Sequence, residues 1–117
     1  MEKNNITVIM AIVNAGYSEK VMESAKNKGA RGGTILNAIG SAGANAEKLY
    51  GITISPEKEI VMIIVPNTIT STILQALYED VGPSTDAQGI AFSLPVEDAT
   101  SNLTHQYLKK SKEKKEL

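Results

Sequence analysis

A glycine-bounded loop in the second half of the chain carries residue types that bind a small anion. It reads GPSTDAQG at Gly82–Gly89, and Ser84, Thr85 and Gln88 supply neutral hydrogen-bond donors. Glycine at such a turn lets backbone N–H groups approach an anion that a side chain would block. The same residue types also form ordinary turns. On their own they leave two interpretations open, a binding loop and a structural turn.

Residues for acid–base or metal chemistry are few in this chain. The single histidine, His105, lies in a polar stretch with no carboxylate or nucleophile arranged beside it, so we interpret it as a surface residue. The chain has no cysteine, which excludes disulfides, thiolate metal sites and a cysteine nucleophile. These residue types favour a binding protein over an enzyme.

Two short apolar segments rich in β-branched residues predict buried strands, at Ile6–Val13 and Glu59–Val65. Each is followed by turn formers, a helical pattern, a loop that contains glycine and another strand, at Thr34–Ile39 and Ile90–Val96. The chain is thus strand–helix–strand written twice. This order predicts an α+β, ferredoxin-like (βαββαβ) domain, with an antiparallel sheet and two helices on one face.

Local signals predict where the two helices begin and end. We expect the first helix to start with Ser18 as its N-cap and to stop before Gly29. The second helix is expected to start at Thr68 or Thr70 and to end at Gly82. Its apolar residues share one stripe: Ile69, Ile73, Leu74, Leu77 and Val81.

Both faces of the predicted sheet are apolar. One set of strand residues alternates with an equally apolar set, and the two sets are Val8, Met10, Ile12, Met62 and Ile64 against Ile9, Val13, Val61 and Ile63. Helices on one side would leave the other face uncovered, and such a face usually pairs with another subunit. The pattern therefore predicts an oligomer.

A long segment without clear periodicity, Gly40–Lys58, separates the second and third predicted strands. Its length exceeds the common range for loops in compact domains, and loops of this kind are typically functional. A strand extension through Ile52–Ile54 is the structural alternative. We place the domain at residues 1–98 and a C-terminal extension with a lysine-rich tail at residues 99–117.

The composition is that of a globular domain, with 117 residues of which 42% are hydrophobic and 21% charged. The net charge is −1, and residues 109–117 hold five Lys against two Glu, so the rest of the chain is acidic. An acidic body argues against nucleic acid as a partner, because that binding depends on Lys and Arg. The longest apolar runs have six residues, far fewer than the roughly 20 that cross a bilayer. We expect a cytoplasmic protein.

Three segments resemble the PII family of nitrogen-regulatory signalling proteins. They are GARGGTILNAIGSAG at Gly29–Gly43, EIVMIIVP at Glu59–Pro66 and GIAFSLPVED at Gly89–Asp98. The resemblance covers residues 6–98 and implies a cytoplasmic homotrimer of ferredoxin-like subunits. It implies that AMP, ADP or ATP binds in clefts between subunits. A protruding loop, the T-loop, here Gly40–Lys58, would regulate a protein partner such as a membrane transporter.

The resemblance also assigns functions to individual residues. Thr34 matches a threonine near the adenine, Gly40 lies at the base of the protruding loop, and Gly89 matches a glycine of the phosphate-side loop. Ile12, Met62 and Ile64 fall on strand positions that are apolar or neighbour the adenine in the family. The predicted nucleotide-binding set is Ile12, Thr34, Gly40, Met62, Ile64, Gly82, Ser84, Thr85, Gln88, Gly89 and Ile90.

The chain departs from the family pattern on the phosphate side. Family members carry an acidic residue, a glycine and a lysine before the phenylalanine of the last strand, where this chain has Gln88-Gly89-Ile90-Ala91-Phe92. Two arginines of the family fall on Ser101 and Leu103. Charge-assisted hydrogen bonds are roughly twice as strong as neutral ones, so these losses predict weaker triphosphate binding. Lys48, Lys58 and Arg31 are the cations that could replace them. The chain resembles a divergent member, and the modification of a loop tyrosine is not carried over to Tyr50.

Other interpretations of the same fold class remain open. A cyclic dinucleotide is sensed by some PII-like proteins and would need fewer cations than ATP. A metal-binding trimer of the CutA type would have to rely on carboxylates, because the chain has one histidine and no cysteine. An acylphosphatase would need an arginine in an anion-binding loop. We interpret Arg31, the only arginine, as a turn or subunit contact.

Overall fold

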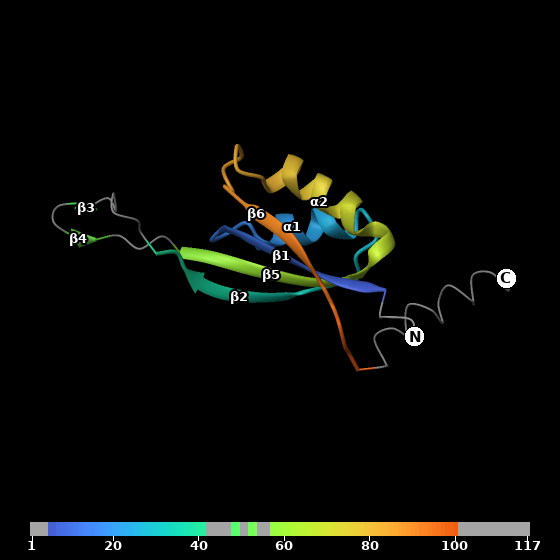
Figure 1. Cartoon of the computed structure of the whole chain (residues 1–117). Helices are drawn as coiled ribbons and strands as arrows, with labels where there is room; N and C mark the ends of the chain where they lie inside the picture. The colour runs from blue at the N-terminus through green and yellow to red at the C-terminus, as the bar shows by residue number, and fades with distance from the viewer. Residues whose placement is uncertain (1–4, 42–47, 50–51, 54–56, 101–117) are drawn as a thin grey trace, which may run out of the picture.

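The computed structural model describes residues 5–41, 48–49, 52–53 and 57–100. Figure 1 shows the arrangement of the elements, which in chain order are β1 (Ile6–Asn14), α1 (Ser18–Lys26), β2 (Thr34–Ile39), β3 (Lys48–Leu49), β4 (Ile52–Thr53), β5 (Glu57–Pro66), α2 (Asn67–Val81) and β6 (Ile90–Pro95). Several residues discussed above lie outside the described residues: Tyr50, Ser101, Leu103, His105 and the lysine-rich tail.

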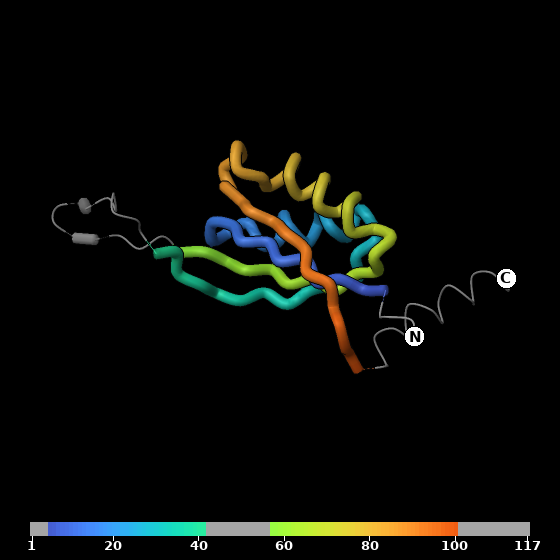
Figure 2. The backbone as a smooth tube through the Cα atoms, viewed as in Figure 1, coloured from blue at the N-terminus to red at the C-terminus, as the bar shows by residue number. Residues whose placement is uncertain are grey.

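Four strands form one antiparallel sheet in the order β2-β5-β1-β6. The two central strands, β1 and β5, are the two most apolar segments, and the edges are β2 and β6. Both helices lie on the same side of this sheet (Figures 1 and 2). The predicted ferredoxin-like architecture is confirmed.

The core lies between the sheet and the two helices. β-Branched residues of the central strands point into it at every second position, because successive strand residues face opposite sides. The fully buried side chains include Ile9, Val13, Val61, Ile63 and Val65 from the sheet, Val21 from α1, and Ile73, Leu77 and Val81 from α2. The apolar stripe predicted for the second helix thus supplies core residues.

The opposite side of the sheet, which we call the open face, carries neither helix. By strand alternation and register its apolar residues are Val8, Met10, Ile12, Leu36, Ile60, Met62, Ile64, Ile90, Phe92 and Leu94. Several remain accessible in the single chain; Phe92 is 40% exposed and Leu94 49%. The sheet is therefore apolar on both faces, as the sequence predicted.

Both helix starts differ from the local prediction. The N-cap of α1 is Tyr17, and Ser18 is the first helical residue. The capping acceptor comes from another strand, since Glu59 Oε1 accepts hydrogen bonds from Gly16 N (2.7 Å) and Ser18 N (3.3 Å).

The start of α2 follows β5 without a separate capping loop. Pro66 is the N-cap, so neither Thr68 nor Thr70 has that position. Thr70 lies inside the helix, where its hydroxyl donates to Pro66 O (3.2 Å) and is hydrogen-bonded to the Thr7 hydroxyl of β1 (2.6 Å). The threonine therefore ties the helix to the sheet.

The segment expected as the Gly40–Lys58 loop is shorter than predicted at its C-terminal end. Glu57 and Lys58 belong to β5 and pair with Ile39 and Ala38 of β2. Within the segment, β3 pairs with β4 in a separate two-stranded sheet. The alternative of a strand extension through Ile52–Ile54 is thus met only by the separate strand at Ile52–Thr53. Residues 42–47, 50–51 and 54–56 lie outside the described residues. Of the helices in the described ranges, none has both the length and the apolar character to span a membrane.

Candidate functional site

The loop after α2 is built from two hydrogen-bonded turns. Thr85 donates to Gly82 O through both its N–H (3.1 Å) and its hydroxyl (2.8 Å). The Gln88 N–H then donates to Thr85 O (2.9 Å), and Gln88 has a positive φ of 46°. These bonds hold Ser84 and Gln88 at the exposed side of the loop, where their side chains are free to face a ligand from solvent.

Gly89 is required by close packing. Its N–H donates to Val81 O (2.8 Å), and an added Cβ would lie too close to that same oxygen and 2.9 Å from Val13 Cγ1. The expectation that Gly89 offers an open N–H to an anion does not hold in this structure, because the carbonyl of α2 already accepts from it. The glycine allows the chain to pass tightly from α2 into β6.

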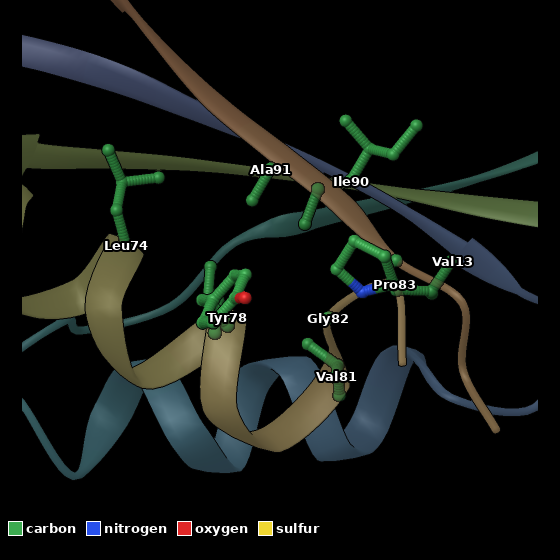
Figure 3. Close-up of a pocket in the computed structure, with 11 residues that line it drawn as sticks. Val13, Leu74, Tyr78, Val81, Gly82, Pro83, Ile90 and Ala91 are labelled. Carbon is green, nitrogen blue, oxygen red and sulfur yellow. The ribbon is translucent and has the colours of Figure 1, made fainter. Parts of the chain in front are cut away.

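A small cavity lies beside this loop, between α2 and β6 (Figure 3). Its volume is about 150 Å³, and its walls include Leu74, Val81, Pro83 and Ala91. Tyr78, 64% exposed, supplies the one side-chain hydroxyl among the lining residues. Drug-sized ligands occupy pockets of roughly 300–1,000 Å³, so this cavity in a single chain is too small for a nucleotide.

The structure divides the predicted binding residues between the two edges of the sheet. Thr34 begins β2 at one edge and pairs with Met62 of β5. Ile90 begins β6 at the other edge and pairs with Ile12 of β1. Three strand spacings of about 4.8 Å separate the edge strands, or about 14 Å in all. Thr34 and the Gly82–Gly89 loop therefore do not meet within one chain.

The remaining predicted residues lie on the central strands or beside β2. Ile12 is on β1 and Met62 on β5, and Ile64 lies on the open face of β5 opposite Val8 of β1. Gly40 directly follows β2 and is half-buried. The edge strands thus carry Thr34 on one side and Ile90 with the adjoining loop on the other.

Lys58 is linked to the Gly82–Gly89 loop through Asn14. Its Nζ donates to Asn14 Oδ1 (2.7 Å), and Asn14 Nδ2 donates in turn to Asp86 O in the loop (3.0 Å). Arg31 precedes β2, which is the strand at the opposite edge of the sheet from β6, and it is exposed. The side chain of Lys48 lies outside the described part of the chain.

Glu59, near the start of β5, is a carboxylate that accepts backbone hydrogen bonds from the turn between β1 and α1. The hydrogen bond from the Gly16 N–H lowers the pKa of this carboxyl below its ordinary value of 4.5, and bonds from Ser18 add to the effect. A carboxylate at a helix N-terminus is also favoured by the helix dipole. Glu59 therefore holds the turn between β1 and α1 against the start of β5.

Sequence reasoning did not single out Asn14 or Glu59. The available signal was weak: each is a polar residue at the end of an apolar strand. The partners of their side chains lie 41 to 72 positions away along the chain, so no local spacing identifies them.

The strand order and the two helices on one face of the sheet define a small ferredoxin-like domain. The sequence matches the family model of nitrogen regulatory protein P-II over residues 6–105, and the chain belongs to that family. A crystal structure of Arabidopsis thaliana PII bound to citrate has the same fold, with a TM-score of 0.61. The two sequences are 20% identical, and the alignment covers 80% of this chain and 79% of the plant chain. No significant match to a curated protein was found.

Proposed function

We infer that this protein is a sensor of adenine nucleotides that acts as a cytoplasmic homotrimer. In this proposal AMP, ADP or ATP binds in clefts between subunits, and the segment Gly40–Lys58 carries the signal to a partner protein, such as a membrane transporter. Family membership supports the proposal, because the matched family is that of nitrogen regulatory protein P-II.

The observation that carries the proposal is the division of the predicted site. Thr34 lies on the edge strand β2 and pairs with Met62 of the central strand β5, whereas the Gly82–Gly89 loop and Ile90 lie at the β6 edge. A ligand that touches both groups must bridge two chains. Closed rings form when one surface of a subunit meets a different surface of the next, and the two edges of this sheet are such a pair.

The open face supports assembly independently. It is apolar across all four strands, and apolar surface contributes about 25 cal/mol for each Å² removed from water. Large contiguous apolar patches are rare on monomers and mark interaction surfaces. Packing three such faces against each other would bury Phe92, Leu94 and their neighbours and would place the β2 edge of one subunit beside the β6 edge of the next.

The phosphate side favours nucleotides with few phosphates. Ile90 stands at the start of β6 with 61% of its surface exposed, and Lys58, which is linked to the loop through Asn14, already donates to Asn14. Hydrogen bonds to charged groups contribute about 1.5–3 kcal/mol each. We therefore propose that the γ-phosphate adds little affinity in this protein.

Calorimetric titration with AMP, ADP, ATP and cyclic di-AMP tests the proposal. We expect binding of at least one adenine nucleotide, with ATP less than tenfold tighter than AMP. Thr34→Glu should abolish binding, and Thr34→Ser is the matched control because it keeps the hydroxyl. A protein that binds none of these compounds, or one that binds only cyclic di-AMP, would contradict the assignment to AMP, ADP and ATP.

A further inference from the structure

Asn14 joins three parts of the chain that are distant in sequence. It ends β1, its backbone N–H donates to Ala87 O (2.9 Å), and its side-chain Nδ2 donates to Asp86 O (3.0 Å). On its other side Oδ1 accepts from Lys58 Nζ (2.7 Å). One residue thus contacts both the Gly82–Gly89 loop and the start of β5.

The chemistry of the two neighbours requires an amide at this position. Lys58 Nζ can only donate, and the backbone oxygen of Asp86 can only accept. The side chain between them must therefore present an acceptor to one and a donor to the other. Asparagine does both at this length, whereas aspartate offers only acceptors and alanine offers neither.

The residues that follow Asn14 hold the same part of β5. Ala15 N donates to Glu57 O (3.1 Å), and Gly16 N donates to Glu59 Oε1 (2.7 Å). Together with the bond from Lys58, three successive residues of β5 are tied to the turn after β1. These three residues lie at the C-terminal base of the Gly40–Lys58 segment.

We propose that Asn14 is a positioning residue that couples the Gly82–Gly89 loop to the base of the Gly40–Lys58 segment. A ligand that orders the loop also fixes Asp86 O and Ala87 O, and Asn14 transmits this order to Lys58 and the start of β5. The inference rests on the proposed function for the identity of the ligand. The coupling itself depends only on the contacts of Asn14.

Amide exchange measured by NMR on the full chain tests the coupling. Gln88 and Gly89 report on the loop through their bonds to Thr85 O and Val81 O, and Ala15 reports on the base through its bond to Glu57 O. In the wild type, saturating AMP should slow exchange at least threefold at both places. In Asn14→Ala, AMP should slow exchange only in the loop. Asn27→Ala, an exposed position at the end of α1, is the matched control and should behave as the wild type.

Asn14→Asp separates the two contacts of the side chain. Aspartate still accepts from Lys58, so the exchange of Ala15 without nucleotide should stay at the wild-type rate. It cannot donate to Asp86 O, so the response of Ala15 to AMP should be lost. Equal slowing of Ala15 in the wild type, Asn14→Ala and Asn14→Asp would overturn the proposal.

A measurement without nucleotide separates this inference from the proposed function. Lys58→Met removes the donor to Asn14 and should speed the exchange of Gln88 at least threefold, although the two residues do not touch. If nucleotides leave every amide of the wild type unchanged, the proposed ligand is wrong, and the Lys58→Met result still decides on the coupling. Unchanged exchange of Gln88 in Lys58→Met would refute it.

Discussion

Gly89→Ala should destabilise the protein strongly, for a reason that the packing of the loop makes explicit. The new Cβ would collide with Val81 O and would lie 2.9 Å from Val13 Cγ1, which is fully buried. Overpacking of this kind costs about 1–3 kcal/mol. The shift needed to relieve it weakens the bond from Gly89 N to Val81 O, for about 0.5–1.5 kcal/mol more. We therefore expect a loss of about 2–4 kcal/mol in the free energy of unfolding.

Urea denaturation at a fixed protein concentration measures this loss, because the stability of an oligomer depends on concentration. Gly32→Ala is the matched control. A Cβ at Gly32 meets no atom within 4 Å, so this variant should lie within about 0.5 kcal/mol of the wild type, as surface substitutions usually do. Equal stability of the Gly89→Ala and Gly32→Ala variants would refute the packing argument. That result would favour the other interpretation, in which the glycine leaves a turn open for an anion.

Two further predictions concern charge. Ile90→Lys should strengthen ATP binding relative to AMP binding by about 10- to 150-fold, since one contact to a charged phosphate is worth about 1.5–3 kcal/mol. Calorimetry measures the two affinities. An unchanged ratio of ATP affinity to AMP affinity would show that residue 90 does not lie beside the phosphates. Glu59→Gln should lower stability at pH 7 by about 0.5–1 kcal/mol, the usual value of a carboxylate at a helix N-terminus. Because the pKa of Glu59 is lowered in the folded protein, its contribution is present above the ordinary value of 4.5 and is lost as the pH falls through the folded pKa. The difference between wild type and variant should therefore shrink on acidification, and a difference that grows would contradict the assignment.

The sequence was sufficient to predict the sheet and the order of its elements. Runs of Val and Ile with β-strand length and flanking turn residues predicted β1 and β5, and β2 was predicted with its observed limits. The signal is local and strong there, because the central strands are apolar on both sheet faces and therefore form nearly continuous apolar runs. The resemblance of three segments also indicated the P-II family, to which the chain belongs.

The features that were missed depend on contacts between distant segments. Ser18 and Thr70 are good capping residues by type, yet the α1 cap is formed by Glu59 and α2 follows Pro66 directly. A local motif also does not reveal that Val81 O occupies the space beside Gly89 and accepts its N–H; the place of Gly89 in a ligand site stays a prediction. Asn14 was passed over for the same reason. Its importance appears only when the fold brings Asp86 and Lys58 to the same strand end.

The central claim is that Thr34 of one subunit and the Gly82–Gly89 loop of the next form one nucleotide site. Two variants that each lose binding test it when they are combined in the same particle. Thr34→Glu blocks the β2 edge, and Gln88→Glu places a like charge against the phosphate in the loop; Gln88→Asn is the control for the latter, since asparagine tolerates a positive φ.

Calorimetry of the two variants co-expressed at equal levels is the most direct measurement. Each homo-oligomer should bind no nucleotide. In the mixed particles, a site is intact where a subunit with native Thr34 precedes a subunit with a native loop, so about one quarter of the wild-type sites should return if the interface is head-to-tail. A site contained within one chain would be defective in every subunit, and the mixture would then bind no nucleotide at all.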